Sequence, residues 1–268
     1  MRLATWNVNS LAVRLPQVLD WLLAQSATSP VDVLVLQETK LTDDKFPQAE
    51  IEAAGYAVQC FGQKTYNGVA LLSRQALGPV SAVVKTIPGL DDPQARVIAA
   101  TVAGMVAGVP TAMRVIGAYI PNGQATDSDK FIYKLRWLEA LREYVQAELA
   151  AHPDLVLMGD YNIAPEDRDV YDPVAWAGQV LCTPQERAHF QALLSLGLVD
   201  AFRLFEQPAK PWTWWDYRNL AFRKNQGLRI DHILVSESLR PLVKACVIDK
   251  LPRKNERPSD HAPVVLEL

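Results

Sequence analysis

Short apolar runs, each about as long as one buried β-strand, recur along this chain and constrain its fold more than any other feature. Between them lie stretches whose apolar residues recur every three or four positions, a spacing typical of amphipathic helices. Strands are expected at residues 2–8, 31–38, 56–61, 68–73, 154–162, 228–235 and 262–268, with a β-rich meander over 80–119. Helices are expected at residues 16–24, 129–151 and 183–196, with a further polar helix that ends near residue 55.

Blocks of strands separated by helices predict an α/β protein with a specific layering. We expect a four-layered α/β sandwich, in which two mostly antiparallel β-sheets pack face to face and are flanked by helices. No repeat, low-complexity tract or linker-like run rich in Pro, Gly and Ser interrupts the pattern. A single domain over residues 1–268 is therefore expected, close to the upper size for one compact core.

The chain shows no signal for a membrane or for export. No run approaches the roughly 18 apolar residues that cross a bilayer, and the N-terminus lacks a basic segment followed by an apolar one. The three cysteines are widely spaced and form no CxxC motif, which fits free thiols in a reducing compartment. We expect a cytoplasmic monomer without a membrane partner.

The charge distribution is uneven along the chain. Between Arg203 and Arg257 there are 12 lysines and arginines against 6 acidic residues, although the net charge of the whole chain is -3. Such asymmetry suits a protein that turns one face to a polyanion and gathers its acids elsewhere. A chance scatter of charges over a solvated surface would give the same count, so charge alone does not identify a partner.

Several of the expected strands end in polar residues that can carry chemistry. A buried carboxylate costs several kcal/mol unless a cation or hydrogen-bond donors compensate it. Because polar or acidic residues recur at five strand ends, a cation shared by them is the simplest explanation. The residues concerned are Asn7, Asn9, Gln37, Glu38, Asp160, Asn162, Asp231, Asp260 and His261.

Carboxylate and amide oxygens are hard ligands that suit Mg²⁺, with Mn²⁺ as a plausible substitute. Glu38 is the first candidate ligand, and Asn7 and Asp260 are expected close to it. Taken singly, Asn7 or Asn162 would more often be a capping or turn residue. The combination of strand ends favours a metal site over that explanation.

His261 is the histidine with the clearest chemical context. It follows a carboxylate in the motif SDHA, and Asp231 is the natural partner to orient its ring, because a carboxylate commonly fixes an imidazole tautomer. The remaining histidines, His152, His189 and His232, are expected to be structural or on the surface.

A resemblance now adds to these interpretations. The motifs WNVNSL, LQETK, GDYNIAP, TWWDYR, GLRIDHILVS and PSDHAPV occur in one order along the chain. Together they resemble exodeoxyribonuclease III and the abasic-site endonucleases, and the resemblance covers essentially the whole chain. The SDH and GDxN motifs alone fit the wider endonuclease/exonuclease/phosphatase superfamily, whose members also cleave inositol phosphates, sphingomyelin and RNA. QETK, WWDYR and GLRIDH point to DNA.

The resemblance implies a role for each motif residue in hydrolysis. Asp160 aligns or deprotonates the attacking water, and Asn162 positions the phosphate. His261, oriented by Asp231, polarises the scissile phosphate, and Tyr119 contacts a phosphate oxygen or assists proton transfer. The metal is held by Asn7, Glu38 and Asp260, with a second position left open among Asp160, Asn162 and His261.

The resemblance also implies a groove for duplex DNA that carries an abasic site or a recessed or blocked 3′ end. Phosphate contacts in such a groove position a duplex without reading its sequence. Trp214 aligns with a tryptophan that packs against a sugar or flanking base, although a core aromatic is an equally good interpretation. The expected groove residues are Arg74, Arg96, Asn122, Lys130, Trp214 and Arg218.

We therefore expect a Mg²⁺-dependent DNA-repair hydrolase with abasic endonuclease, 3′-phosphatase or phosphodiesterase, and 3′-to-5′ exonuclease activities. The loop over residues 163–182 decides their balance, and small residues at Ala177 and Gly178 leave room for an everted sugar. One alternative is an enzyme that processes 3′ ends with little abasic endonuclease activity. Others are a superfamily phosphatase on a non-DNA ester and a DNA-binding protein that has lost catalysis.

Overall fold

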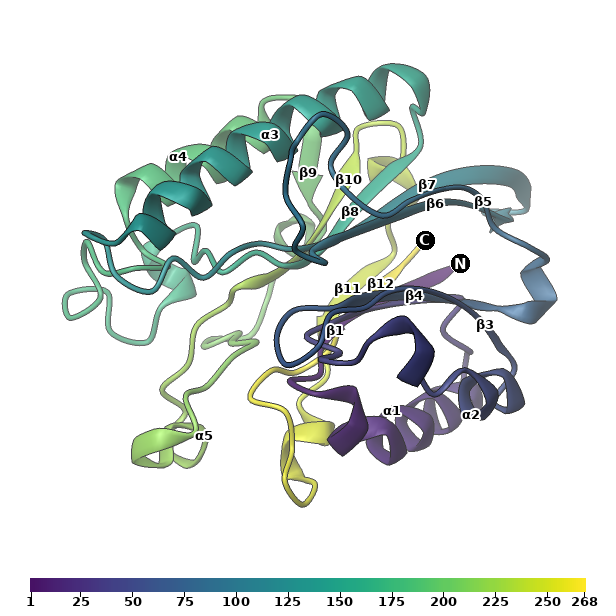
Figure 1. The fold of residues 1–268 in the computed structure, drawn as a ribbon, viewed down its shortest axis with the longest axis horizontal. Helices are drawn as coiled ribbons and strands as arrows, with labels where there is room; N and C mark the ends of the chain where they lie inside the picture. Colours follow the sequence, from purple (N-terminus) through teal and green to yellow (C-terminus); the bar gives the residue numbers. More distant parts are fainter.

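The computed structural model describes residues 1–268 and contains two six-stranded sheets that pack face to face (Figure 1). The first sheet has the strand order β11-β12-β1-β2-β4-β3, and the second has β5-β6-β7-β8-β10-β9. The first comprises β1 (Arg2–Asn7), β2 (Val33–Gln37), β3 (Tyr56–Phe61), β4 (Val69–Arg74), β11 (Ala245–Ile248) and β12 (Val264–Glu267). The second comprises β5 (Ser81–Val84), β6 (Val97–Val106), β7 (Val109–Tyr119), β8 (Leu155–Asp160), β9 (Leu198–Asp200) and β10 (Asp231–Ser236).

Helices cover the outer face of each sheet, which confirms the predicted four-layered sandwich. In Figure 1, α1 and α2 lie under the first sheet, and α3 and α4 lie over the second. Every strand pair is antiparallel except β1 with β2 and β7 with β8. The helices are α1 (Leu11–Ser26), α2 (Gln48–Ala53), α3 (Asp129–Ala151), α4 (Pro184–Leu194) and the short α5 (Ala221–Lys224).

Helix α1 begins at Leu11, earlier than the expected start at residue 16. Pro16 lies inside it, where it removes one backbone hydrogen bond. Both Pro16 and Ala12, whose carbonyl loses that donor, are exposed, so water can take the place of the missing donor. The helix therefore continues through a residue that was expected to start it.

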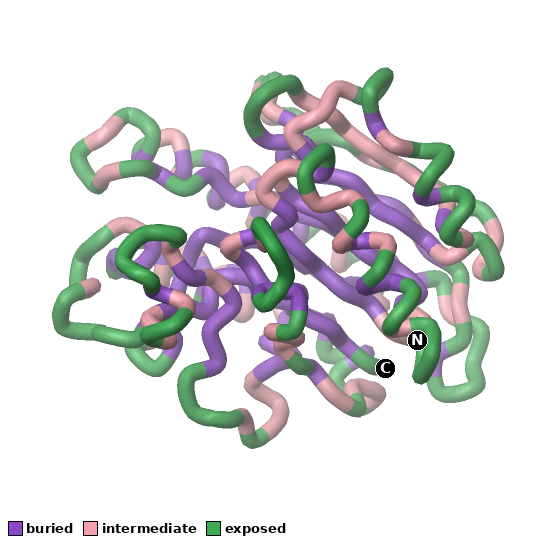
Figure 2. Tube along the Cα trace, turned by 90° about the horizontal axis from the view of Figure 1, so that it is seen from below, coloured by how far each residue is buried: buried purple, intermediate pink, exposed green.

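Strand β2 shows why the strands read as continuous apolar runs rather than alternating ones. Val33 and Val35 belong to the core between the two sheets, whereas Leu34 and Leu36 belong to the core between the first sheet and α1. Both faces of the strand are thus buried, which removes any need for polar residues until the strand ends. Figure 2 shows these buried strands enclosed by exposed loops.

The sheet registers bring the polar strand ends to one edge of the sandwich. Asn7 ends β1 beside Gln37 at the end of β2, and Tyr119 ends β7 beside Asp160 at the end of β8. Asp231 opens the antiparallel strand β10 opposite Asp160. Parallel strands end at the same edge and an antiparallel neighbour begins there, so these residues converge.

The opposite edge holds the chain termini, where the Met1 ammonium donates to the Leu268 carbonyl at 2.9 Å. Close packing beside the polar edge depends on one glycine. A Cβ on Gly159 would lie 1.8 Å from the Ala118 carbonyl oxygen. No helix of the protein combines the length and the apolarity needed to span a bilayer.

Candidate active site

Three buried side chains, Asp231, His261 and Asp160, lie in a row at the polar edge. The Nδ1 of His261 lies 2.9 Å from an Asp231 carboxylate oxygen, and its Nε2 lies 3.7 Å from an oxygen of Asp160. Ligating atoms of these three residues all fall within 4.8 Å of one another. The predicted pairing of His261 with Asp231 is therefore present.

Burial and charge set the protonation of this row. Burial raises the pKa of Asp160 to about 7, and Asp231 adds to the rise while His261 opposes it. Burial alone would lower the pKa of His261, but the carboxylates of Asp231 and Asp160 outweigh it and raise that pKa to about 10. At neutral pH the imidazole is thus a cation between two acids.

Glu38 occupies the neighbouring part of the site, just beyond the end of β2. Its Oε1 accepts hydrogen bonds from Asn7 Nδ2 and from the Tyr119 hydroxyl, each at 2.9 Å, and Lys40 lies 2.9 Å from its Oε2. Its φ of 53° lies in the left-handed region, which is costly for a residue with a Cβ and is concentrated at functional sites. Burial opposes ionisation, but Lys40 and Asn7 lower the pKa of Glu38 below its usual value.

Asn7 bridges two of the acids as a donor. Its Nδ2 also donates to Asp160 at 2.8 Å, and its Oδ1 accepts from the backbone N–H of Asn9 at 3.0 Å. A metal ligand must offer an oxygen, and the oxygen of Asn7 faces the backbone. In this arrangement Asn7 holds Glu38 and Asp160 together, and the ligand role expected for it stays a prediction.

Tyr119 is held from both sides. The Arg96 guanidinium lies 4.8 Å from the centre of its ring, and its hydroxyl donates to Glu38. Burial and the negative charges of Glu38 and Asp160 raise the pKa of Tyr119 well above its usual value. The hydroxyl therefore keeps its proton and serves as a donor.

Asn162 follows β8 with a left-handed φ of 49°. Its backbone N–H donates to Asp160 at 2.9 Å, and its Oδ1 accepts from Asn122 Nδ2 at 2.9 Å. Its Nδ2 donates to the Ile120 carbonyl at 3.0 Å, which leaves one amide hydrogen for another acceptor. Asn162 is therefore oriented by the loops on either side of it.

Asp260 lies on the wall formed by the C-terminal loop. One oxygen accepts from Asn9 Nδ2 and the other from Trp214 Nε1, each at 3.0 Å. Trp214 also forms isolated β-bridges with Leu228 and His261. Trp214 thus packs against residues of the site and also lines the cleft. Both interpretations of Trp214, as a packed aromatic and as a site residue, therefore apply.

The chemistry of this donor set fits a hard divalent cation. Several carboxylates converge in a buried space, and the pKa of Asp160 rises to about 7 because burial and nearby acids disfavour its charge. A cation would relieve that repulsion, and Glu38, Asp160 and Asp260 line one cleft with oxygen ligands. His261 lines the same cleft between two carboxylates, where a protonated ring can contact an anion, and its part in a second metal position stays a prediction.

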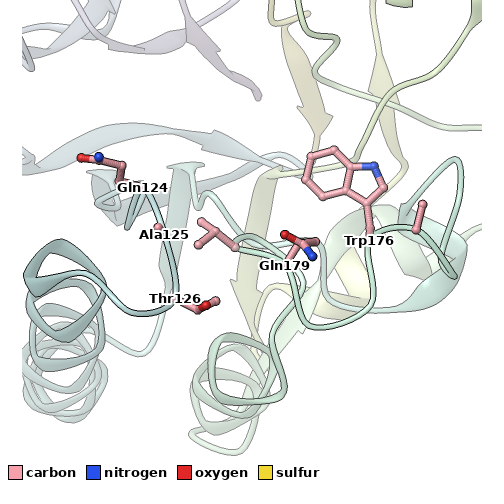
Figure 3. A pocket seen from close by; sticks show the side chains of 7 residues that line it. Gln124, Ala125, Thr126, Trp176 and Gln179 are labelled. Atoms are coloured by element: carbon pink, nitrogen blue, oxygen red, sulfur yellow. The ribbon is translucent and has the colours of Figure 1, made fainter.

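The cleft has a volume of about 370 Å³, and its walls combine aromatic and apolar side chains with polar ones such as Asp216 and Arg218. Trp176, Val180 and Leu181 of the 163–182 loop line it together with Trp214 and Ile230. Figure 3 shows the adjoining cavity, where Trp176 and Gln179 lie across from the segment Gln124–Thr126.

The expectation about small residues in the 163–182 loop is wrong. Ala177 and Gly178 line neither this cleft nor the adjoining cavity, and Gly178 is exposed. A one-turn coil of the loop directs the large side chain of Trp176 inward instead. The loop therefore contributes the indole of Trp176 to the wall of the cleft.

The expected groove residues divide into two groups. Arg218 and Asn122 line the cleft, and Arg96 and Lys130, again with Asn122, line a second cavity beyond Tyr119. Arg96 is mostly buried, and its guanidinium is bound to Gln94 and to the Tyr119 carbonyl.

Arg74 does not belong to this groove. Strand β4 runs antiparallel to β2 and begins with Val69 opposite Gln37, so Arg74 lies at the far end, roughly 17 Å along the strand. There it forms an ion pair with Asp32 at 2.8 Å. The register of the sheet places Arg74 away from the site, and the order of the motifs in the sequence does not reveal this register.

The other three histidines take the structural or surface positions expected for them. His152 caps the C-terminus of α3, and His189 lies on α4. His232 is buried, where its Nδ1 faces Arg229 and its Nε2 faces the Ile163 carbonyl. Burial lowers its pKa well below the usual value, so it stays neutral.

Two contributors to the site were not assigned from the sequence. Lys40 contacts Glu38 and the Asn9 side chain, and Trp176 lines the cleft. The motif QETK contained the signal for Lys40, which follows Glu38 by two residues. No local pattern marks Trp176, because the fold of its loop alone brings it to the cleft.

Comparisons with known proteins agree with this geometry. A family model described as the Endonuclease/Exonuclease/phosphatase family matches residues 4–261. The chain is 35% identical to exodeoxyribonuclease III of Haemophilus influenzae, with 100% of this chain and 99% of that protein covered. The solved 3′ phosphatase NExo from Neisseria, bound to a product DNA hairpin, is 49% identical with a TM-score of 0.92, covering 100% of this chain and 99% of that one. An AP endonuclease from Archaeoglobus fulgidus is 35% identical with a TM-score of 0.89, covering 99% and 98%.

Proposed function

The chain belongs to the endonuclease/exonuclease/phosphatase family as an exodeoxyribonuclease III-like hydrolase, and from that premise we propose that it hydrolyses phosphate esters of damaged DNA. Its substrates are duplexes with an abasic site or a blocked 3′ end. The observation that carries the proposal is the buried row of Asp231, His261 and Asp160, which faces Glu38 across one cleft. The basic segment between Arg203 and Arg257 supports a polyanionic partner.

Asp160 accepts the proton of the attacking water. A general base works best when its pKa lies near the working pH, and the pKa of Asp160 is raised to about 7. Asn7 and the backbone N–H of Asn162 hold its two oxygens, so the carboxylate cannot rotate freely. The water is thereby presented in a fixed direction.

His261, Tyr119 and Asn162 stabilise the negative charge that develops on the phosphate. His261 stays protonated between two carboxylates, and Tyr119 keeps its hydroxyl proton, so both are donors at neutral pH. Asn162 has a free amide hydrogen held at the end of β8. Donors that are oriented before the reaction stabilise a transition state more than mobile ones do.

Glu38 and Asp260, with Asp160 nearby, would hold Mg²⁺, for which Mn²⁺ is a plausible substitute. When bound, the cation neutralises charge on the phosphate oxygens. Without the cation, the Lys40 ammonium provides a positive charge beside the Glu38 carboxylate. We propose that the enzyme acts as a cytoplasmic monomer.

A second candidate, an enzyme specialised for 3′ ends, is favoured by one observation. Trp176 and Leu181 narrow the cleft where an everted abasic sugar would enter, whereas a terminal phosphate needs less room. The similarity to a 3′ phosphatase, at 49% identity, points the same way. The two candidates share a mechanism and differ in the ratio of their substrates.

The deciding experiment measures Mg²⁺-dependent cleavage of a duplex with one internal abasic analogue, beside a nicked duplex with a 3′-phosphate. Asp160→Asn serves as the control, since it keeps the shape of the side chain and removes the base. Incision that vanishes in the control supports the abasic endonuclease. Removal of the 3′-phosphate without incision supports the second candidate, and activity on neither substrate refutes the proposal.

A further inference from the structure

Lys134 is a fully buried cation on α3 that the mechanism above does not use. Its side chain has no exposed surface, and its ammonium makes three hydrogen bonds. Two go to backbone carbonyls, of Asn162 at 2.6 Å and Asn122 at 3.1 Å, and the third goes to the Glu186 carboxylate. All three N–H groups are therefore satisfied within the protein.

Glu186 extends this connection to another segment. The oxygen that binds Lys134 also accepts the backbone N–H of Leu181 at 3.0 Å. The second oxygen accepts the backbone N–H of Thr183 at 3.0 Å and its hydroxyl at 2.7 Å. The Lys134–Glu186 pair thus binds three segments of two loops: the start of the loop after β7, and the start and the end of the long loop after β8.

Each of these segments supplies a wall of the cleft. Asn122, Asn162 and Leu181 all line it. The side chains of Asn122 and Asn162 reach each other at 2.9 Å, which requires that their backbones keep the spacing that Lys134 bridges. The backbone of Asn162 in turn holds Asp160 through its N–H.

Stability alone is a weak explanation for such a pair. Removing two charges from water costs about as much as their attraction returns, so a buried ion pair contributes little net stability. The same charges do fix the relative positions of the three segments, because each makes hydrogen bonds that tolerate little displacement. A displacement of about 1 Å at a catalytic group lowers rates by on the order of 100-fold.

We propose that Lys134 is a positioning residue for the hydrolysis, and that its pair with Glu186 sets the spacing of these three segments around the phosphate. The proposal rests on the proposed function. Its expected signature is a loss in kcat larger than the change in DNA affinity, because the groove contacts of residues such as Lys130 and Arg218 are left intact.

The test replaces both charges at once, since Lys134→Met alone would leave Glu186 buried and unpaired. Lys134→Met/Glu186→Gln is compared with Arg114→Met/Glu148→Gln, which removes an ion pair with a buried arginine in the middle of β7, opposite the first residue of β8. We expect similar losses in Tm but a kcat lowered roughly 10- to 100-fold only in the first variant, with Kd for DNA changed by less than about 3-fold.

A second readout does not depend on activity. Amide hydrogen exchange at Asn162 and Leu181 is expected to accelerate at least about 10-fold in the Lys134 variant and to stay unchanged in the Arg114 variant. Equal kcat values in the two variants, or unchanged exchange at both amides, overturn the positioning role. If the unmodified protein cleaves no DNA, the proposed function fails by itself, and the exchange measurement still decides whether Lys134 holds the loops.

Discussion

His261 Nδ1 lies 3.1 and 2.9 Å from the two carboxylate oxygens of Asp231, and both side chains are almost completely buried. A ring held in this way at Nδ1 cannot rotate, so its Nε2 is directed toward Asp160 and the cleft. The carboxylate also stabilises the imidazolium. Orientation and charge of the imidazole that faces the cleft therefore depend on Asp231, which does not itself line the cleft.

Asp231→Asn is expected to lower kcat by on the order of 100- to 10⁴-fold, because an amide can present an N–H to Nδ1 and no longer favours the imidazolium. Steady-state kinetics on the DNA substrate that the wild type prefers measure the effect, and circular dichroism checks folding. Asp249→Asn, a change at a carboxylate bound to Trp21, is the matched control. A kcat within a factor of two of wild type would show that the pair is only structural.

Tyr119→Phe removes one hydroxyl from the site and keeps the ring under Arg96. We expect kcat to fall about 100-fold, the usual cost of one oriented donor, with little change in DNA affinity. Tyr133 lines the cavity beyond Tyr119, and its hydroxyl donates to Asp92 at 2.6 Å. Tyr133→Phe removes this hydroxyl and should leave kcat nearly unchanged. Equal losses in both variants would contradict a specific role for Tyr119.

The polar edge of the sandwich was predictable because its signal is local. Each buried strand tolerates polar residues only where it ends, so Glu38 and Asp160 stand out in the sequence, and the face-to-face packing of the two sheets brings their strand ends together. Arg74 was misplaced because the register between β2 and β4 depends on non-local pairing. Lys134 reads as an ordinary charged residue of an amphipathic helix, and only the packed loops make it buried.

The stability of the metal-free protein should fall as pH rises. The folded protein raises the pKa of His261 to about 10, so it retains a proton that the unfolded chain releases above about 6.5. The stabilisation by His261 is fully present below that pH and is lost as pH approaches 10. We expect Tm to decrease between pH 6.5 and 9.5, and His261→Gln should flatten this slope. An equal slope in the variant would assign the effect to other groups.

Binding of Mg²⁺ should release protons at neutral pH. A cation beside Asp160 favours its ionised form, and the pKa of that carboxyl is about 7 in the metal-free protein. Calorimetry in buffers of different ionisation enthalpy measures the number of protons released. Glu38→Gln should weaken Mg²⁺ binding at least about 10-fold, whereas Glu50→Gln on the exposed side of α2 should not. Unchanged affinity in Glu38→Gln would exclude it as a ligand.

Trp176 should control the ratio of the two proposed activities. Its indole lines the cleft beside Leu181, and the adjoining cavity separates it from Gln124 (Figure 3). Trp176→Ala removes a large wall side chain, so an everted abasic sugar gains space while a terminal phosphate already fits. We expect abasic incision to rise roughly 10-fold relative to 3′-phosphate removal, since shape complementarity of a pocket for a flipped nucleotide sets substrate choice.

The control for this change is Val174→Ala, in the same loop but 88% exposed and outside the cleft. It should alter neither activity, because its side chain faces solvent. If Trp176→Ala lowers both activities equally, the indole stacks on the DNA and supports every substrate, as aromatic platforms do for unpaired bases. If the ratio shifts while 3′-phosphate removal keeps its rate, the wall of the cleft, and not the catalytic row shared by both reactions, determines which lesion the enzyme repairs.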